Sequence, residues 1–493
     1  MKKFDITGKT YGRMLLCLLA ILAIELAFLM LHPLVHIDSG WTAEVSNMLA
    51  SEGRMAAPSW SGFLNQEDYF FWRPPLFFVF EAAIFKLLGF GLLQVGLLNA
   101  FIILATFAIV ITEAKKLYGK PAAIVASAVL ASNFMYLLHG VFHGRPDPLV
   151  GLLNLISMKY LLEYSSTRAK KAFLLSAFFA SLSALTHELG LLMVATVAIV
   201  LVKENGMKDL LRTLLQLVKM AAIFIAVFIP YLLYASMQPA IFSEQVGWLL
   251  GRHGSIQNVI QDEVIRYYWA FTTNSGAMAP WFAFFMALMI FTAIRRDFSP
   301  IPLAIFMHLF LMFFIGNKAT YYYIAIVPLA ALLAGKIFSE ISMDEMKSRI
   351  AIGAVLLTFL SSIALFGYFA LKVSPQFDFF ALNSALASEK YGMVVAQPAY
   401  YYAMQGRMYS AYAIFNRIDR GESLPSVISQ LKPGAFYYDP LNLEASSPPE
   451  FKQYLLEETA LVKIVCARNG RVYYDADCKD DKYRVEIYKP KQA

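Results

Sequence analysis

Residues 14–31 read MLLCLLAILAIELAFLML, an unbroken apolar run that contains a single charged side chain, Glu25. Eleven of these residues are Leu, Ile or Phe, and each favours membrane insertion by roughly 0.3 to 0.6 kcal/mol. Together they outweigh the lone carboxylate, which opposes insertion by roughly 3 kcal/mol. Because the run is long enough to cross the hydrocarbon core as a helix, it predicts a transmembrane helix.

The start of the chain is basic, as it would be in a cleaved secretory signal peptide, with Lys2, Lys3, Lys9 and Arg13 before the apolar run. However, the run is longer than the apolar region of a signal peptide. The residues from Leu31 onward, LHPLVHIDSG, offer no small-residue cleavage site. We therefore expect residues 14–31 to stay in the protein as a membrane anchor.

The rest of the chain repeats this composition. Hydrophobic residues make up 58% of the sequence and charged residues only 16%, which lies outside the range of soluble domains. Ten further segments have the same apolar character: 92–113, 121–138, 147–163, 172–186, 189–202, 220–237, 277–294, 299–315, 321–336 and 350–371. The sequence predicts a polytopic α-helical membrane protein with about eleven transmembrane helices.

Lysine and arginine gather in every second loop between these segments. The basic loops contain Lys115, Lys116 and Lys120; Arg168, Lys170 and Lys171; Lys203, Lys208, Arg212 and Lys219; Arg295 and Arg296; and Lys336, Lys347 and Arg349. This is the positive-inside pattern, which predicts a cytoplasmic N-terminus and, with an odd number of spans, an extracytoplasmic C-terminus. The net charge of +7 therefore reflects membrane topology, and we expect no nucleic-acid partner.

One apolar segment, residues 75–91, carries Glu81 and Lys86. If it crossed the bilayer, every later loop would change sides and the basic loops would face outward, against the positive-inside pattern. We expect it to form a juxtamembrane or re-entrant helix at the outer interface.

The composition changes near residue 373. Residues 1–372 form the predicted membrane domain, with outer loops over 33–91 and 238–276. Residues 373–493 alternate short β-rich runs, over 393–396, 435–438, 461–467 and 482–488, with helical patterns over 382–390 and 450–458. This alternation predicts a small extracytoplasmic α/β domain. In that compartment Cys466 and Cys478 could form a disulfide, whereas Cys17 lies within the first predicted span.

The predicted topology brings ionisable residues from distant loops to one outer membrane face. They are Asp38, Arg73, Arg145, Asp147, His187, Glu188, Lys318 and Tyr321. Carboxylates and cations at a lipid–water boundary suit glycosyl transfer from a lipid-linked donor. Asp38 could act as a base toward an acceptor hydroxyl, and arginine and lysine could bind a departing lipid phosphate. Such a reaction needs no nucleotide-binding motif.

Four motifs resemble those of the GT-C-fold membrane glycosyltransferases, in the protein O-mannosyltransferase-like group that includes lipid A aminoarabinose transferases. An acid, Asp38, follows the first span, and the sequence FWRPPL at residues 71–76 matches an aromatic-(Lys/Arg)-Pro-Pro-Leu motif. The sequence RPD at 145–147 matches an R-x-D turn, and KATYYY at 318–323 with Pro328 matches a K-x-x-x-Y…P element. The resemblance covers about residues 10–340.

The resemblance implies an enzyme that moves a hexose or pentose from a polyprenyl-phosphate-linked donor. It implies that Asp38 is the catalytic acid-base residue and Asp147 a second catalytic acid. Donor phosphate would contact Arg73, Arg145, Lys318 and Tyr321. Two departures from the family pattern, Ser39 and Trp72 in place of Glu, leave any metal site undefined. A divalent metal is the only cofactor that we consider, with His187 and Glu188 as candidate ligands.

Other interpretations compete with this one. Asp38 could serve as a helix N-cap, and Arg145 with Asp147 could be a local ion pair that closes a turn. A transporter or flippase for an envelope lipid or glycan precursor would need ionisable residues near the bilayer midplane and an inverted repeat, whereas here the charges gather at one face. A non-catalytic assembly subunit is a third alternative. The acceptor, which could be a lipid, a polysaccharide or a protein, and the donor sugar stay open.

Overall fold

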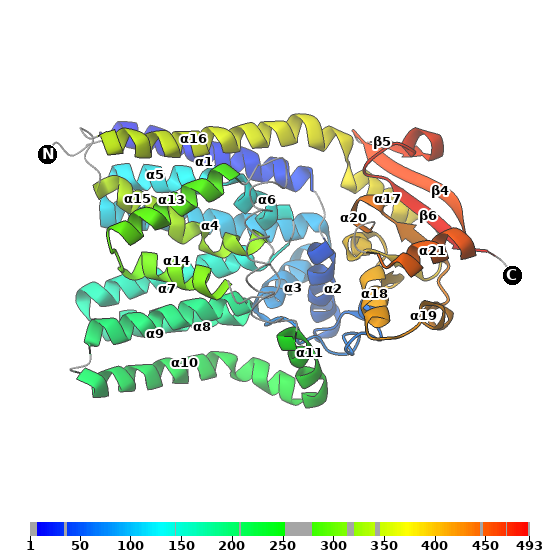
Figure 1. Ribbon diagram of the computed structural model, residues 1–493, viewed down its shortest axis with the longest axis horizontal. Coiled ribbons are helices and arrows are strands. Elements are labelled where there is room, and N and C mark those ends of the chain that lie inside the picture. The colour runs from blue at the N-terminus through cyan, green and yellow to red at the C-terminus, as the bar shows by residue number, and fades with distance from the viewer. Residues whose placement is uncertain are drawn as a thin grey trace.

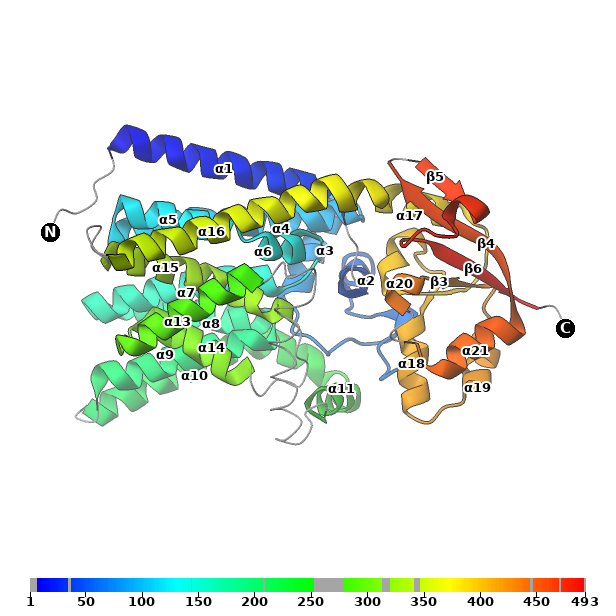
Figure 2. The ribbon, with the colours of Figure 1, turned by 45° about the horizontal axis from the view of Figure 1, so that its top comes forward.

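The computed structural model describes residues 7–33, 37–142, 144–206, 209–251, 279–312, 320–340, 346–443, 447–469 and 471–491. Long helices lie side by side in a bundle, and a smaller domain built on a β-sheet sits at one end of it (Figures 1 and 2). The predicted fold class, a helical membrane protein with a small C-terminal α/β domain, is confirmed at this level.

Each predicted span overlaps at least one helix of the bundle. These helices are α1 (Gly8–Leu31), α4 (Leu92–Tyr118), α5 (Lys120–Ala131), α6 (Phe134–Phe142), α7 (Asp147–Thr167), α8 (Lys170–Thr186), α9 (Leu191–Asn205), α10 (Leu210–Ser236), α13 (Ala279–Ile294), α14 (Pro300–Met312), α15 (Val327–Glu340) and α16 (Met346–Tyr368). Within the described ranges, five helical stretches are long and apolar enough to cross a bilayer: Gly8–Leu31, Leu92–Tyr118, Leu210–Ser236, Tyr322–Glu340 and Leu356–Ser388. The count of eleven spans therefore stays a prediction.

The prediction of one continuous helix over residues 121–138 was wrong. Helix α5 ends at Ala131 and α6 begins at Phe134. The break follows from Asn133, whose side-chain Oδ1 accepts a hydrogen bond of 2.8 Å from the backbone N–H of Tyr136. Asparagine is favoured at helix N-termini for this reason, so it starts a second helix where apolar composition alone suggested continuity.

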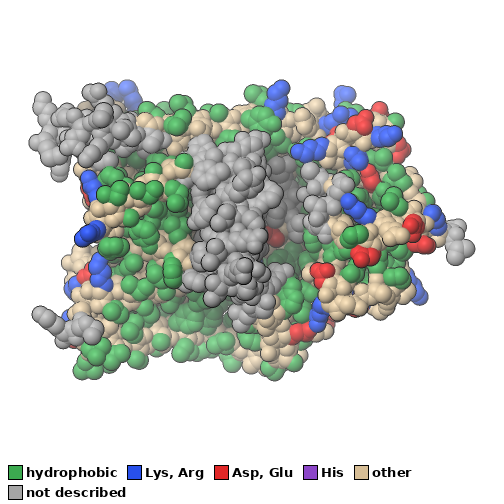
Figure 3. Space-filling view, viewed as in Figure 1, with side chains coloured by type: hydrophobic (Ala, Val, Ile, Leu, Met, Phe, Trp, Pro, Cys, Tyr) green, Lys and Arg blue, Asp and Glu red, His purple; other side chains and the backbone are tan. Residues whose placement is uncertain are grey.

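The basic loops meet at the end of the bundle that lies away from the sheet, here called the basic end. Lys336 pairs with Asp297 at 2.5 Å, and Arg295 pairs with Glu340 at 3.0 Å. On the face shown in Figure 3, hydrophobic side chains cover the helices, and charged side chains gather at the basic end and over the sheet. The basic loops thus lie at one end of the bundle, as the sequence predicts. The compartment that each end faces stays a prediction.

Three short helices lie at the opposite end of the bundle, here called the domain end: α2 (Ile37–Glu52), α3 (Leu76–Leu88) and α11 (Pro239–Gly251) (Figure 1). Helix α3 has 13 residues, which span roughly 20 Å and are too few to cross a bilayer. Its Glu81 is buried and accepts a 2.5 Å hydrogen bond from Ser46 of α2. Helix α3 therefore lies at the domain end, next to α2, and the placement of residues 75–91 at the outer membrane interface stays a prediction.

The C-terminal domain is built on a six-stranded mixed sheet with the order β2-β1-β3-β6-β4-β5. Its strands are β1 (Val394–Ala396), β2 (Met408–Ser410), β3 (Ala435–Tyr438), β4 (Thr459–Arg468), β5 (Arg471–Tyr474) and β6 (Val485–Pro490). Its main helices are α17 (Phe379–Ser388), α18 (Ala411–Asp419), α19 (Leu424–Leu431) and α21 (Pro449–Glu458). Strand β1 is parallel to β2 and β3, whereas β6 is antiparallel to β3 and β4.

Helix α2 joins the two parts of the molecule. The hydroxyl of Tyr402 donates to the carbonyl of Ser39 at 3.1 Å. At Gly40, a Cβ atom would lie only 1.7 Å from the carbonyl oxygen of Pro398, so no other residue fits there without movement of the backbone. The C-terminal domain therefore packs directly on the helix that begins beside Asp38.

Cys466 and Cys478 form a disulfide, as the sequence suggested. The bond links β4 to the 3₁₀ turn Asp475–Cys478 and closes a loop with a sequence separation of 12. In the chain-entropy model, such a link stabilises the folded state by about 3 kcal/mol.

The protein contains three cysteines, so thiol labelling tests the disulfide. We expect one labelled cysteine, Cys17, per chain after denaturation without reductant, and three after reduction. Three labelled thiols without reductant would contradict the disulfide. Labelling under native conditions is not informative, because Cys466 and Cys478 are both buried.

Candidate active site

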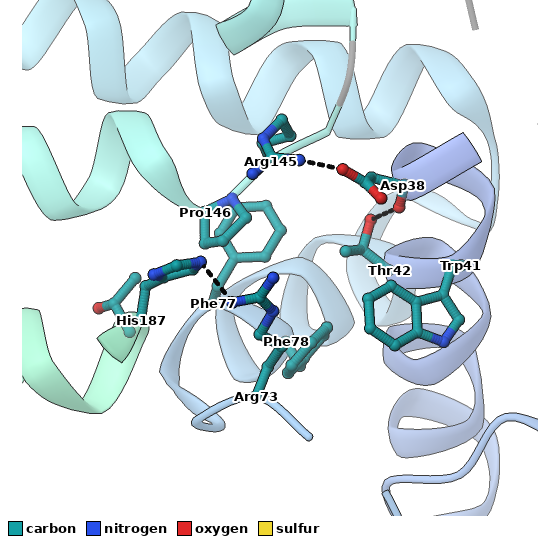
Figure 4. A pocket seen from close by; sticks show the side chains of 10 residues that line it. Asp38, Trp41, Thr42, Arg73, Phe77, Phe78, Arg145, Pro146 and His187 are labelled. Atoms are coloured by element: carbon teal, nitrogen blue, oxygen red, sulfur yellow. Dashed lines mark hydrogen bonds and ion pairs between the residues drawn. The ribbon is translucent and has the colours of Figure 1, made fainter. Parts of the chain in front are cut away.

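A small cavity of about 20 Å³ lies at the domain end of the bundle, among residues from four separate parts of the chain. Its lining consists of Asp38, Trp41, Thr42, Arg73, Phe77, Phe78, Arg145, Pro146, Thr186 and His187 (Figure 4). The predicted topology thus placed Asp38, Arg73, Arg145 and His187 correctly at one site. The apolar half of the lining was not predicted, although Phe77 and Phe78 directly follow the FWRPPL motif.

Asp38 lies in the first turn of α2, and its side chain is 27% exposed. Its carboxylate pairs with the guanidinium of Arg145 (Figure 4). The hydroxyl of Thr42 donates to the carbonyl of Asp38 at 2.8 Å and lies 3.1 Å from the carbonyl of Gly144. Thr42 therefore ties the start of α2 to the loop that carries Arg145. A carboxylate in a first helical turn is also favoured by the helix dipole, so a structural role accompanies any catalytic one.

Arg145 bridges two carboxylates. Its Nε donates to Asp147 at 2.8 Å, and one terminal nitrogen donates to Asp38. Arg145 is 3% exposed and Asp147 is fully buried. The local ion pair considered from the sequence does form, but the same guanidinium also reaches a residue 107 positions away. The ring of Tyr322 lies 5.7 Å from the guanidinium carbon of Arg145.

A second cluster of charges adjoins the first. Arg73 lies 2.7 Å from Nε2 of His187 and pairs with Glu188. Burial alone would raise the pKa of Glu188, but the charge of Arg73 holds that pKa at about 2. Burial lowers the pKa of His187 to about 4. At neutral pH the cluster therefore consists of a cation, an anion and a neutral imidazole.

The charge balance of these groups limits what they can bind alone. Two guanidinium groups, Arg73 and Arg145, face three carboxylates, Asp38, Asp147 and Glu188, which gives these five described groups a net charge of −1. A phosphate would therefore compete with the carboxylates for the arginines, or would need a further cation. Lys318 is a candidate for that cation from the sequence, but it lies outside the described residues, as does the side chain of Tyr321.

The structure offers no support for a metal site. Across the described parts of the chain, no group of three or more His, Cys, Asp or Glu side chains could hold a metal ion. His187 and Glu188, the candidate ligands, both contact Arg73. The guanidinium thus already places a positive charge beside the carboxylate. Metal binding there stays an untested prediction.

Comparisons with known proteins agree with this architecture. The family model described as dolichyl-phosphate-mannose-protein mannosyltransferase matches residues 72–234, about a third of the chain. The crystal structure of ArnT from Cupriavidus metallidurans bound to undecaprenyl phosphate superposes with a TM-score of 0.64 at 15% sequence identity, and covers 96% of this chain and 97% of that one. The chain has the GT-C fold.

The apo structure of the same ArnT superposes with a TM-score of 0.61 at 16% identity, with the same coverage of both chains. Because nearly the whole of each chain takes part, the GT-C resemblance includes the C-terminal sheet domain as well as the helical bundle. No curated protein sequence matches this chain. The resemblance inferred from FWRPPL and RPD is thereby confirmed at the level of fold. The family model matches RPD and all of FWRPPL except Phe71.

Proposed function

We propose that this protein is a membrane glycosyltransferase that moves a sugar from a polyprenyl-phosphate-linked donor to an acceptor at the outer face of the cell membrane. The observation that carries the proposal is the bridge from Asp38 through Arg145 to Asp147, beside Arg73, in a cavity at the domain end of a GT-C fold. The match to the mannosyltransferase family model and the fold shared with ArnT, whose structure contains undecaprenyl phosphate, support it.

Donor binding depends on the arginines in this proposal. A phosphate oxygen forms strong charge-assisted hydrogen bonds with a guanidinium group. Arg145 and Arg73 are both held in place by carboxylates, so their donors are oriented before a ligand arrives. Lys318 and Tyr321 would complete the phosphate site, and Lys318 would offset the negative charge of the carboxylates.

The two acidic residues take different roles. Asp147 is fully buried, whereas the Asp38 carboxylate is partly exposed and lines the cavity. Asp38 therefore accepts the proton of the acceptor hydroxyl while that oxygen bonds to the anomeric carbon. The bond between this carbon and the phosphate oxygen breaks, and polyprenyl phosphate leaves with the bonding electrons. Asp147 orients Arg145 toward that phosphate.

The shared use of Arg145 gives the reaction an order. Before the donor binds, Arg145 pairs with the carboxylate of Asp38. When the donor phosphate takes up donors of Arg145, this carboxylate is released and can turn to the acceptor hydroxyl. Donor binding thus precedes activation of the acceptor.

Transfer by the purified full-length protein in liposomes tests the proposal. The donors are synthetic polyprenyl phosphates that carry labelled hexoses or pentoses, and the acceptor is an envelope extract of cells that lack this protein. We expect label in the extract together with released polyprenyl phosphate. Addition of a chelator tests the requirement for a metal. Envelope glycans with identical mass spectra in the presence and absence of the protein, combined with no transfer from any donor, would contradict the proposal.

A further inference from the structure

A second and larger cavity lies where the helical bundle meets the C-terminal domain. We call it the α4–α17 groove, and its volume is about 460 Å³. It is lined by Phe90, Gly91, Leu92, Leu93 and Gln94 on the bundle side, and by Phe379, Phe380, Asn383, Tyr402, Ala403, Gln405 and Arg407 on the domain side. None of these residues lines the cavity around Asp38. The volume of the groove is in the range of sites for small ligands.

The groove has an apolar side and a polar side. Phe90 stacks on Tyr402 with 5.4 Å between the ring centroids, and Leu93 and Phe380 are each about 40% exposed. Leu93 belongs to the first turn of α4, a helix long and apolar enough to cross the bilayer. The groove is therefore at the level where a membrane helix leaves the lipid, and its apolar side is suited to the upper part of an acyl chain.

The polar side carries a positive charge without a carboxylate partner. Arg407 donates to the backbone carbonyls of Glu389, Tyr391 and Ala387 at 3.0 to 3.4 Å. Over the described residues, no carboxylate lies within ion-pair distance of Arg407. This differs from the catalytic cavity, where both arginines are paired with acids. The carbonyls fix the side chain but leave its charge uncompensated, so an anion at the groove would be attracted.

Asn383 adds a second polar feature. In the part of the chain that the structure describes, its buried Oδ1 has no hydrogen-bond partner. A buried carbonyl oxygen without a partner costs roughly 1 to 3 kcal/mol. Rotation of the Asn383 amide toward the groove that this residue lines would let the oxygen accept a hydrogen bond from a ligand hydroxyl. The groove thus combines the cation of Arg407, the amide of Asn383, whose oxygen accepts no hydrogen bond from the described residues, and an apolar wall. These features match a phospholipid whose head group carries a phosphate and hydroxyls.

We propose that the α4–α17 groove binds the head group of an anionic phospholipid from the surrounding bilayer, with the phosphate at Arg407 and the head-group hydroxyl at Asn383. Tyr402 connects the groove to the active site, because its ring forms part of the groove and its hydroxyl donates to Ser39, next to Asp38. A lipid that packs against Tyr402 therefore steadies the start of α2 and the carboxylate on it.

Photolabelling of the full-length protein in nanodiscs tests this proposal without any sugar transfer. The probes are phosphatidylglycerol and phosphatidylcholine, each with a diazirine placed near the head group, and mass spectrometry locates the labelled residues. We expect phosphatidylglycerol to label peptides that contain Leu93 and Phe380 about fivefold more than phosphatidylcholine does, since one arginine at a membrane surface has roughly this effect.

Two variants and one control localise the effect. We expect Arg407→Gln to remove the preference for phosphatidylglycerol at the groove. We expect the same of Gln405→Glu, which places a negative charge on an exposed residue and should not disturb the fold. Arg471→Gln makes the same change of charge as Arg407→Gln at an exposed residue of strand β5 that does not line the groove, and should leave the preference intact.

Three outcomes would overturn the proposal. These are equal labelling of the wild-type groove by both lipids, full phosphatidylglycerol labelling in a folded Arg407→Gln protein, and an equal loss in Arg471→Gln. If Arg407→Gln fails to fold, unchanged labelling in Gln405→Glu overturns the proposal instead. Because the measurement is binding, it stands or falls separately from the glycosyltransferase activity.

Discussion

Asp38→Asn is expected to lower the rate of sugar transfer by about 10²- to 10⁴-fold, the usual contribution of a general base. Asparagine keeps the size of the side chain but cannot accept the proton of an acceptor hydroxyl. Donor binding should survive, because Arg73 is unchanged and Arg145 still pairs with Asp147. The measurement is single-turnover transfer from a labelled polyprenyl-phosphate donor, together with the donor Kd.

Glu52→Gln is the matched control for this change. Glu52 lies at the other end of the same helix, is exposed and pairs with Arg54 at 2.9 Å. The substitution Glu52→Gln removes one carboxylate from α2, and Glu52 does not line the cavity. Transfer should therefore stay within about twofold of the wild type, as is usual for exposed positions. If Asp38→Asn kept near wild-type turnover, Asp38 would be only a favourable charge at the start of a helix and the mechanism would fail.

Arg145→Ala is expected to act on both donor binding and stability. It removes the guanidinium proposed to contact the donor phosphate, so the donor Kd should rise at least tenfold, in line with the loss of a charge-assisted hydrogen bond. It also leaves the fully buried Asp147 without its arginine, and breaking a buried pair in this way costs about 3 to 5 kcal/mol. Donor titration and denaturant unfolding measure the two effects.

The double variant Arg145→Ala with Asp147→Asn separates these effects. The second change removes the unpaired buried charge, so most of the lost stability should return. Donor binding should stay weak, since the cation is still missing. Recovery of donor affinity in the double variant would show that Arg145 acts on the fold alone and that the phosphate is bound elsewhere.

Much of the architecture could be predicted from composition because membrane insertion depends on apolar length and on the position of charges. The predicted strands over 393–396, 435–438, 461–467 and 482–488 correspond to β1, β3, β4 and β6. Strands β2 and β5 were missed; both are edge strands that are defined by pairing with a single neighbour, which only the folded sheet shows. The break between α5 and α6 was missed because a single asparagine decides it.

The sequence by itself determined which end of the bundle carries the candidate active site. The alternation of basic loops assigns each loop to one end of the bundle, and Asp38, Arg73, Arg145 and His187 all fall on loops of the other end. The motifs FWRPPL and RPD then indicated a GT-C glycosyltransferase, and the structure has that fold. Topology is sufficient to assign these residues to one end of the bundle, because it depends on the order of segments along the chain and not on distances between side chains.

Only the tertiary structure decided which charges pair. Arg73 pairs with Glu188, 115 residues away, and Arg145 pairs with Asp38 as well as with its neighbour Asp147. Ion pairs and perturbed pKa values depend on separations of a few ångströms and on burial, and residues far apart in sequence acquire both only when helices pack. The α4–α17 groove likewise arises where α4 and the C-terminal domain meet, and neither segment contains it alone.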